Sequence, residues 1–304
     1  MAIGALTPPI KVNSILANAG KDARQISALV LHARKIAMSI LGGWHGKRKQ
    51  GSGDNFWQFR PYDGGESASR IDWRRSARDN TLYIRDREWE AAQTVFLWPD
   101  QSPSMQYKSK FCEHSKEERA LLLTLILGEV FAQNGERIAI PSILPPISAR
   151  NGAEHMAISL VNHQPAAISM DLSVLSHYSH LIIASDFLDD MSVLEQRFTK
   201  LAELNIRVHL IQISDPSEEV FPYQGHVLFQ DPESGVELDA GRAQIYQQDY
   251  CRLFAARRAH LKDICRHYGW GFCLSLTDEP VTKTLSALNI AMNADLGFRR
   301  GHIA

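Results

Sequence analysis

The stretch Thr94-Val95-Phe96-Leu97-Trp98-Pro99-Asp100-Gln101-Ser102-Pro103-Ser104-Met105 indicates the fold of this chain more clearly than any other. Its apolar run is short enough for a buried strand, and a D-x-S-x-S motif, made by Asp100, Ser102 and Ser104, follows directly. In open α/β sheets, ligands bind where the strands end. Carboxylate and hydroxyl oxygens on a tight turn suit a hard cation such as Mg²⁺ or Mn²⁺. The motif therefore predicts either a metal-holding loop or a Ser-rich turn whose side chains cap backbone amides.

Two further apolar runs also end at an acidic residue. The run 180–185 stops at Asp186, and the run 206–213 is followed by Asp215 and Pro216. We expect Asp186 to lie at a strand end beside Asp100, so that two carboxylates converge on one crevice. Asp-Pro is a common turn opener, so we expect Asp215 to begin a turn.

From Thr94 onward, strand-like and helix-like runs alternate along the chain. This alternation predicts an α/β fold with a mainly parallel sheet flanked by helices. The expected strands are 94–98, 137–144, 180–185, 206–213 and 271–276, and the expected helices are 116–134, 153–163, 190–204 and about 241–268. We expect Asp239 to cap the last of these helices and a short hairpin, around 227–229 and 236–238, to precede it. A final helix is expected to start near Pro280.

The segment before this alternating region has a different character. Residues 1–25 show no sustained periodicity, which predicts a loose N-terminal tail. Apolar residues then recur at helical spacing to Leu41, and short extended runs follow. The sequence thus predicts an accessory helix and small β-rich lobe over 26–90, an α/β domain over 91–291 and a C-terminal tail over 292–304.

The densest charged region of the chain lies in the predicted lobe, between Arg60 and Arg78. If this region were an enzyme site, Asp63, Glu66 and Asp72 would be metal ligands or acid/base groups. The alternative that we favour is a network of arginine–carboxylate pairs with a packed Trp73, because arginines outnumber acids. A docking surface for a partner protein, formed by the three residues Trp73, Arg74 and Arg75, is a further reading.

Composition excludes several classes of protein. The chain has 304 residues, 44% of them hydrophobic and 22% charged, with a formal net charge of -1, which argues against a nucleic-acid-coating protein. No apolar run is long enough to span a bilayer and no signal sequence is recognisable, so we expect a cytoplasmic protein without membrane insertion. The motifs of P-loop nucleotide hydrolases and of common serine hydrolases are absent.

Several motifs, taken in order, resemble the bacterial "domain of unknown function 58" family. They are Gly51-Ser52-Gly53, Phe59-Arg60-Pro61-Tyr62, Arg70-Ile71-Asp72-Trp73-Arg74, Ser76-Ala77-Arg78, Asp100-Gln101-Ser102-Pro103-Ser104-Met105, Asp231-Pro232-Glu233 and Leu276-Thr277-Asp278. That family is similar to von Willebrand factor A-like domains. In those domains a metal-ion-dependent adhesion site combines D-x-S-x-S with a Thr from a second loop and an Asp from a third.

The resemblance implies a set of ligands and a partner. Asp100, Ser102 and Ser104 match the first loop and Asp186 fits the third, whereas the Thr has no clear counterpart; Ser148 or Asn151 would have to replace it. The family resemblance also implies a MoxR-type AAA+ ATPase as partner, in assembly or maturation of other proteins, and it implies no enzymatic activity.

From these observations we expect a non-catalytic, Mg²⁺-dependent protein-binding module. Asp100, Ser102, Ser104 and Asp186 would hold the cation, directly or through water, and a partner's carboxylate would complete its coordination. Two alternatives stay open at this point. One is a metal-dependent hydrolase that uses the same residues, and the other is a scaffold with no functional metal.

Overall fold

The computed structural model describes residues 22–41, 50–51, 55–62, 67, 69, 71–78, 81–88, 93–162 and 170–298. The chain forms two compact units, which we describe separately. The sheet domain comprises Met1–Trp44 and Thr94–Ala304, and the β lobe comprises His45–Gln93. The sequence motifs for the metal site and for the arginine-rich segment therefore belong to different units.

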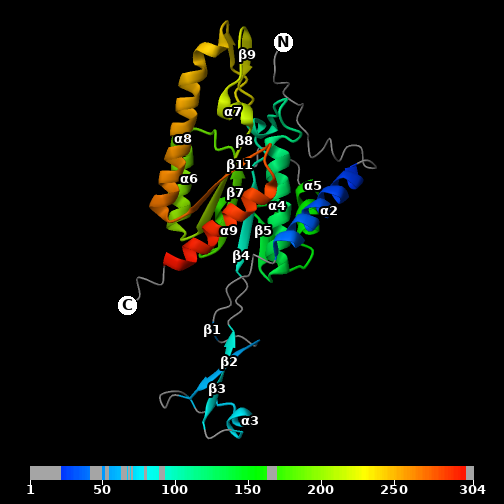
Figure 1. Cartoon of the computed structure of the whole chain (residues 1–304), viewed down its shortest axis with the longest axis vertical. Helices are drawn as coiled ribbons and strands as arrows, with labels where there is room; N and C mark the ends of the chain where they lie inside the picture. Colours follow the sequence, from blue (N-terminus) through cyan, green and yellow to red (C-terminus); the bar gives the residue numbers. More distant parts are fainter. Residues whose placement is uncertain are drawn as a thin grey trace. The chain divides into compact units, whose positions relative to one another are not determined.

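The sheet domain is a mixed α/β structure with a mostly parallel six-stranded sheet in the order β11-β8-β7-β4-β5-β6 (Figure 1). Its strands are β4 (Thr94–Pro99), β5 (Arg137–Ile140), β6 (Leu144–Ile147), β7 (His180–Ser185), β8 (Arg207–Ser214) and β11 (Gly271–Leu276). Every pairing is parallel except that of β5 with β6. The expected fold class is confirmed. The single strand expected over 137–144 is instead an antiparallel pair, joined through Ser142, which has a positive φ of 60°.

Helices cover both faces of this sheet (Figure 1). The helices of the sheet domain are α2 (Asp22–Ile40), α4 (Lys116–Gln133), α5 (Gly152–Asn162), α6 (Met191–Glu203), α7 (Pro216–Val220), α8 (Gln247–Tyr268) and α9 (Val281–Phe298), with the short 3-10 helices η3 (Pro103–Gln106), η4 (Leu172–Val174) and η5 (Ala243–Tyr246). Helices α6 and α8 lie on one face, and α4 and α9 lie on the other. A hairpin of β9 (Val227–Gln230) and β10 (Glu237–Ala240) precedes η5 and α8.

Some boundaries differ from those expected. Asp239 does not cap α8, because it lies within β10, opposite Leu228. Helix α9 continues to Phe298, so much of the expected tail 292–304 is helical. Helix α2 begins at Asp22, inside the expected tail, and residues 1–21 lie outside the described residues.

Helix α2 also belongs to the sheet domain and not to the lobe with which the sequence grouped it. It packs against α4 and α5. Arg34 Nη2 lies 3.2 Å from Glu154 Oε2, and its Nε lies 3.5 Å from Glu129 Oε1. The domain boundary therefore falls after Trp44, since α2 buries its apolar face against the helical layer.

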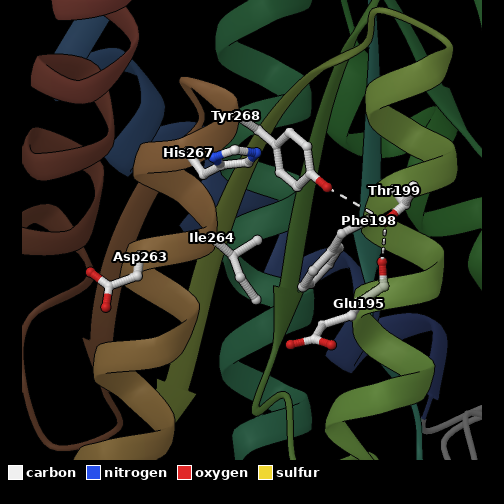
Figure 2. Close-up of a pocket in the computed structure, with 7 residues that line it drawn as sticks. All are labelled: Glu195, Phe198, Thr199, Asp263, Ile264, His267 and Tyr268. Carbon is white, nitrogen blue, oxygen red and sulfur yellow. Dashed lines mark hydrogen bonds between the residues drawn. The ribbon is translucent and has the colours of Figure 1, made fainter.

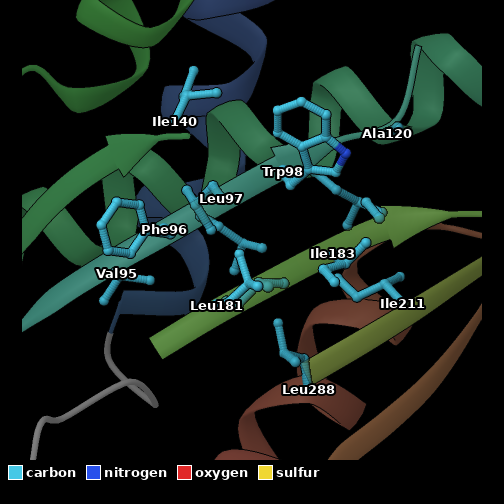
Figure 3. Packing of buried hydrophobic residues seen from close by; sticks show 14 of the residues in the cluster. Val95, Phe96, Leu97, Trp98, Ala120, Ile140, Leu181, Ile183, Ile211 and Leu288 are labelled. Carbon is cyan, nitrogen blue, oxygen red and sulfur yellow. The ribbon is translucent and has the colours of Figure 1, made fainter. Parts of the chain in front are cut away.

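The core of the sheet domain lies between the strands and the helices on both faces, with α4, α6, α8 and α9 all contributing buried residues; part of it is shown in Figure 3. All six residues of β4 are buried, as expected for a central parallel strand. The side chains of Phe96, Leu97, Leu181 and Ile183 are each at most 4% exposed. Burial of one such side chain stabilises the fold by about 1.5–3 kcal/mol.

Helices α4 and α5 approach each other unusually closely. A Cβ atom added at Gly152 would lie 2.3 Å from the carbonyl oxygen of Gly128, and one added at Gly128 would lie 2.4 Å from Met156 Sδ. Only glycine permits this separation of the two backbones. The crossing fixes the position of α4, whose first turn contributes to the candidate site.

The β lobe contains a three-stranded antiparallel sheet in the order β1-β3-β2. Its strands are β1 (Gln50–Gly51), β2 (Asn55–Pro61) and β3 (Tyr83–Glu88), and its helix is α3 (Trp73–Ser76). Ile71 and Ile84 are buried and form an isolated bridge. The expected β-rich structure is therefore present in this unit.

Candidate functional site

The D-x-S-x-S motif forms a compact turn at the carboxyl end of β4. The amide of Asp100 donates to the carbonyl oxygen of Ala184 at 2.9 Å, which ties the ends of β4 and β7 together. Asp100 Oδ1 accepts a hydrogen bond from the Ser102 amide at 2.9 Å. The hydroxyl oxygens of Ser102 and Ser104 lie 3.1 Å apart. The structure thus brings the three residues of the motif together on one turn, where they present one carboxylate and two hydroxyls.

Asp186 follows β7, as expected, and lies beside Asp100. Its negative charge is one of the causes that raise the pKa of Asp100, although burial is the largest cause. Ser185 donates its hydroxyl to Asp100 Oδ2 at 2.6 Å and opposes that rise. Two strand-end carboxylates therefore share one edge of the sheet.

A buried lysine, which the sequence analysis did not identify, neutralises Asp186. Lys116 is the first residue of α4, is 1% exposed, and places its Nζ 2.8 Å from Asp186 Oδ2 and 2.7 Å from Glu218 Oε1. Burial alone would lower the pKa of Lys116, but the charges of Asp186 and Glu218 outweigh burial and raise it. Lys116 is therefore charged at neutral pH. The other oxygen of Asp186, Oδ1, accepts from the Leu188 amide at 3.1 Å.

Glu117, the next residue of α4, is a second group that sequence reasoning missed. It is 5% exposed, and within the described ranges its carboxylate has neither a hydrogen-bond partner nor an ion-pair partner. Burial, followed by the charges of Glu118 and Asp100, raises the pKa of Glu117 to about 7. Its position in the first turn of a helix would ordinarily lower the pKa of a carboxyl, so burial and these neighbours prevail.

A signal for Lys116 and Glu117 was present in the sequence. Ser115 and Glu118 form a capping box, in which each side chain accepts from the other residue's amide at 3.2 and 3.1 Å. The S-x-x-E pattern marks the start of the helix that follows β4. In a parallel α/β sheet, the start of such a helix lies at the carboxyl edge, where ligands bind.

Asp215, the third strand-end acid, has a structural role as a helix cap. It caps α7, where its Oδ1 accepts from the amide and the hydroxyl of Ser217 at 2.9 and 2.8 Å. Its Oδ2 accepts from the Ser109 amide at 3.1 Å. Burial alone would raise the pKa of Asp215, but these hydrogen bonds outweigh burial and lower it. The expectation that Asp215 opens a turn is confirmed.

The two residues considered as replacements for the missing Thr lie in the loop that follows β6. Ser148 is exposed, and the Asn151 side chain donates to Glu154 Oε2 at 3.1 Å. Neither has a contact with Asp100, Ser102 or Ser104 in the hydrogen bonds of the described chain. The hydroxyl that does contact Asp100 from another segment belongs to Ser185, the last residue of β7.

The donor set decides which cation this edge could hold. Within the described residues, no three acidic, histidine or cysteine side chains converge closely enough to hold a metal ion by themselves. A cation here would therefore need the hydroxyls of Ser102 and Ser104 as well as carboxylates. Such an all-oxygen set suits Mg²⁺ or Mn²⁺. The carboxylate of Glu117 supports the fit, because it is buried and has no hydrogen-bond donor or cation among the described residues.

The arginine-rich motif of the β lobe contains a helix cap. Asp72 Oδ1 accepts from the Arg75 amide at 3.0 Å, and the Arg75 guanidinium lies 4.8 Å from the centre of the Tyr83 ring. Trp73 is 63% exposed, so its side chain is not packed within the β lobe, and packing of Trp73 onto the sheet stays a prediction. Arg74 is also exposed. Asp63 and Glu66, which an enzyme reading would have used, lie outside the described residues.

A separate pocket of about 330 Å³ lies between α6 and α8 (Figure 2). Its lining residues are Glu195, Phe198, Thr199, Asp263, Ile264, His267 and Tyr268. The Thr199 hydroxyl lies 3.4 Å from the Tyr268 hydroxyl across it. None of the residues predicted from the sequence lines this pocket.

No helix in the part of the chain that the structure describes is long and apolar enough to cross a membrane. The chain is 25% identical to an uncharacterized protein of Mycobacterium bovis. The alignment has 266 residues and covers 82% of this chain and 83% of that protein. An uncharacterized protein of Mycobacterium tuberculosis matches with the same values.

A crystal structure of the conserved hypothetical protein BatB from Bacteroides thetaiotaomicron aligns with a TM-score of 0.36 and 14% identity, over 68% of this chain and 100% of that chain. A family model described as "Protein of unknown function DUF58" matches residues 58–260, which extend from the β lobe into α8. Because this match spans more than half of the chain's length, the chain belongs to the DUF58 family.

Proposed function

We propose that the carboxyl edge of the sheet is a divalent-cation-dependent site for binding a partner protein. The observation that carries this proposal is the D-x-S-x-S turn itself, in which Asp100 and two hydroxyls 3.1 Å apart lie on one short segment. Carboxylate and hydroxyl oxygens in this number cannot fill an octahedral Mg²⁺ site alone. A carboxylate from a partner would supply a further ligand, so that binding depends on the cation.

Asp100, Ser102 and Ser104 would hold the cation in this proposal, and Asp186 would contribute mainly through its charge. Lys116 already neutralises Asp186 in part, which leaves Asp186 better suited to accept from cation-bound water than to bind directly. Mg²⁺ would supply electrostatic bridging between this edge and an acidic group, without bond breakage. The partner that the DUF58 resemblance implies is a MoxR-type AAA+ ATPase, with assembly or maturation of other proteins as the outcome.

The test is affinity capture of a MoxR-type ATPase on the immobilised full chain, with Mg²⁺ and with EDTA. We expect EDTA to reduce capture at least tenfold, and Ser102→Ala and Ser104→Ala to weaken capture in Mg²⁺ toward the EDTA level. Ser286→Ala is the matched control, because this exposed serine of α9 belongs to none of the residues at the sheet edge. Capture that is equal in Mg²⁺ and EDTA would refute a cation-dependent site.

A further inference from the structure

The first turn of α4 carries a buried acid that neither the sequence motif nor the family comparison assigns to the site. Glu117 follows Lys116, whose amide donates to the carbonyl oxygen of Tyr107 at 3.3 Å. Tyr107 directly follows η3, the short helix that contains Ser104. Helix α4 also packs against β4 and η3. The backbone that carries Glu117 is thereby held against the D-x-S-x-S turn.

The two neighbouring side chains at this helix start have opposite environments. Lys116 is buried between two carboxylates, at 2.8 and 2.7 Å, and its charge is compensated. Glu117 is also buried, at 5% exposure against 1% for Lys116, yet the described residues offer it no cation and no hydrogen-bond donor. A buried carboxylate without such a partner costs free energy unless it binds a proton or a cation. The charges near it, Glu118 and Asp100, are both negative.

From this arrangement, and resting on the proposed cation-dependent function, we propose that Glu117 is a direct ligand of the divalent cation, together with Asp100, Ser102 and Ser104. Asp186 then serves as a positioning residue, because its Oδ2 already forms an ion pair with Lys116. Four oxygens from one turn and one helix start would surround the cation on one side. The open side would face the partner. This assignment also gives the site a second acid in place of the Thr for which the chain has no clear counterpart.

The test is direct titration of Mn²⁺ into the purified full chain, with free Mn²⁺ measured by electron paramagnetic resonance. We expect the wild type to bind one Mn²⁺, Asp100→Asn to lose binding, and Glu117→Gln to raise the Kd at least tenfold. Glu117→Asp, which keeps the charge on a shorter side chain, should give an intermediate Kd. The matched control is Glu113→Gln, because Glu113 is an exposed acid of the segment that leads into α4.

The outcomes separate this inference from the proposed function. A Kd for Glu117→Gln within twofold of the wild type, while Asp100→Asn loses binding, would overturn the role of Glu117 and leave the cation site intact. Absence of Mn²⁺ binding by the wild type, with and without the captured ATPase, would overturn both. Circular dichroism and thermal unfolding of each variant confirm that the protein is folded. If Glu117→Gln does not fold, Glu117→Asp decides: a Kd within twofold of the wild type would overturn the role of Glu117, and a larger rise would support it.

Discussion

Two acidic regions at the same edge of the sheet differ in how many hydrogen-bond donors their carboxylates have. After β8, Asp215 accepts from two amides and two hydroxyls, and its pKa is lowered. After β4, Asp100 accepts from one amide and one hydroxyl, Glu117 has no partner among the described residues, and the pKa of each is raised. Strand-end position alone therefore does not mark a functional acid. An acid with unmet bonding capacity is the better candidate for binding a ligand.

The largest expected effect comes from removing the buried charge of Lys116, which contacts acids at this edge of the sheet. Lys116→Met would leave Asp186 and Glu218 buried without their counter-ion, so we expect a loss of about 3–5 kcal/mol in the free energy of unfolding, measured with urea. Lys110→Met, at an exposed position of the preceding loop, should change stability by less than about 0.5 kcal/mol. A Lys116→Met variant as stable as the control would show that Lys116 does not hold these acids in the folded protein.

The pH dependence of stability gives the next largest effect, through Glu117. Its pKa rises from 4.5 to about 7 on folding, so the folded state holds this proton more tightly than the unfolded state. The favourable contribution is complete below pH 4.5, decreases as the pH rises, and is lost above about 7. The total change is on the order of 3 kcal/mol.

Urea unfolding in EDTA between pH 4.5 and 8 measures this change as the difference between wild type and Glu117→Gln. We expect the variant to become the more stable protein as the pH rises. Glu113→Gln should instead follow the wild type across the range, since its side chain is exposed. Parallel curves for wild type and Glu117→Gln would show that Glu117 is not perturbed.

A third experiment sets Asp215 directly against Asp100. Asp215→Ala removes a helix cap and leaves buried amides unpaired, so we expect a loss of about 2 kcal/mol in stability and an unchanged response to Mg²⁺. Asp100→Asn should change stability little, but it should abolish the stabilisation of about 1.4 kcal/mol that Mg²⁺ gives at ten times its Kd. Thermal unfolding with and without Mg²⁺ measures both. The reverse pattern would mean that Asp215, and not Asp100, is the functional acid.

The smallest expected effect concerns Asp72 of the β lobe, whose carboxylate already accepts a hydrogen bond from a backbone amide. Asp72 caps α3, so Asp72→Ala should reduce the stability of the β lobe by about 1 kcal/mol. Trp73→Ala should change stability by less than about 0.5 kcal/mol because the side chain is exposed. Hydrogen exchange of the β2 and β3 amides measures both effects. A larger loss for Trp73→Ala than for Asp72→Ala would show that Trp73 packs in solution.

The sequence predicted the parts of this structure that depend on local pattern. The β4 run, the acids at strand ends and the alternation of strands with helices were recognisable, because burial on both faces requires apolar runs and turns require particular residues. The division of 137–144 into two antiparallel strands was not predicted, since a continuous apolar pattern is compatible with one strand or with a bend. The assignment of α2 to the sheet domain depends on packing against α4 and α5, which sequence periodicity does not reveal.

The candidate site could be predicted in part for the same reason. Asp100, Ser102, Ser104 and Asp186 were found because they follow apolar runs directly. Lys116 was missed because its role depends on burial and on two partners distant in sequence, Asp186 and Glu218, and Glu117 was missed because its role depends on burial. A lysine and a glutamate at a helix start are ordinarily solvent-exposed. Only the three-dimensional structure shows that both are buried.

The pairing of β1 with β3 has a thermodynamic consequence for the whole chain. The β lobe is an insertion of 49 residues, 45–93, between α2 and β4, which belong to one unit. In the folded lobe, Gln50 pairs with Glu88, so the two ends of the insertion are adjacent. Between the end of α2 at Ile40 and the start of β4 at Thr94, this pairing shortens the loop that must close from 53 residues to about 15, which lowers the entropic cost of docking α2 by about 1 kcal/mol. Unfolding of the lobe would therefore weaken the docking of α2 by lengthening this loop.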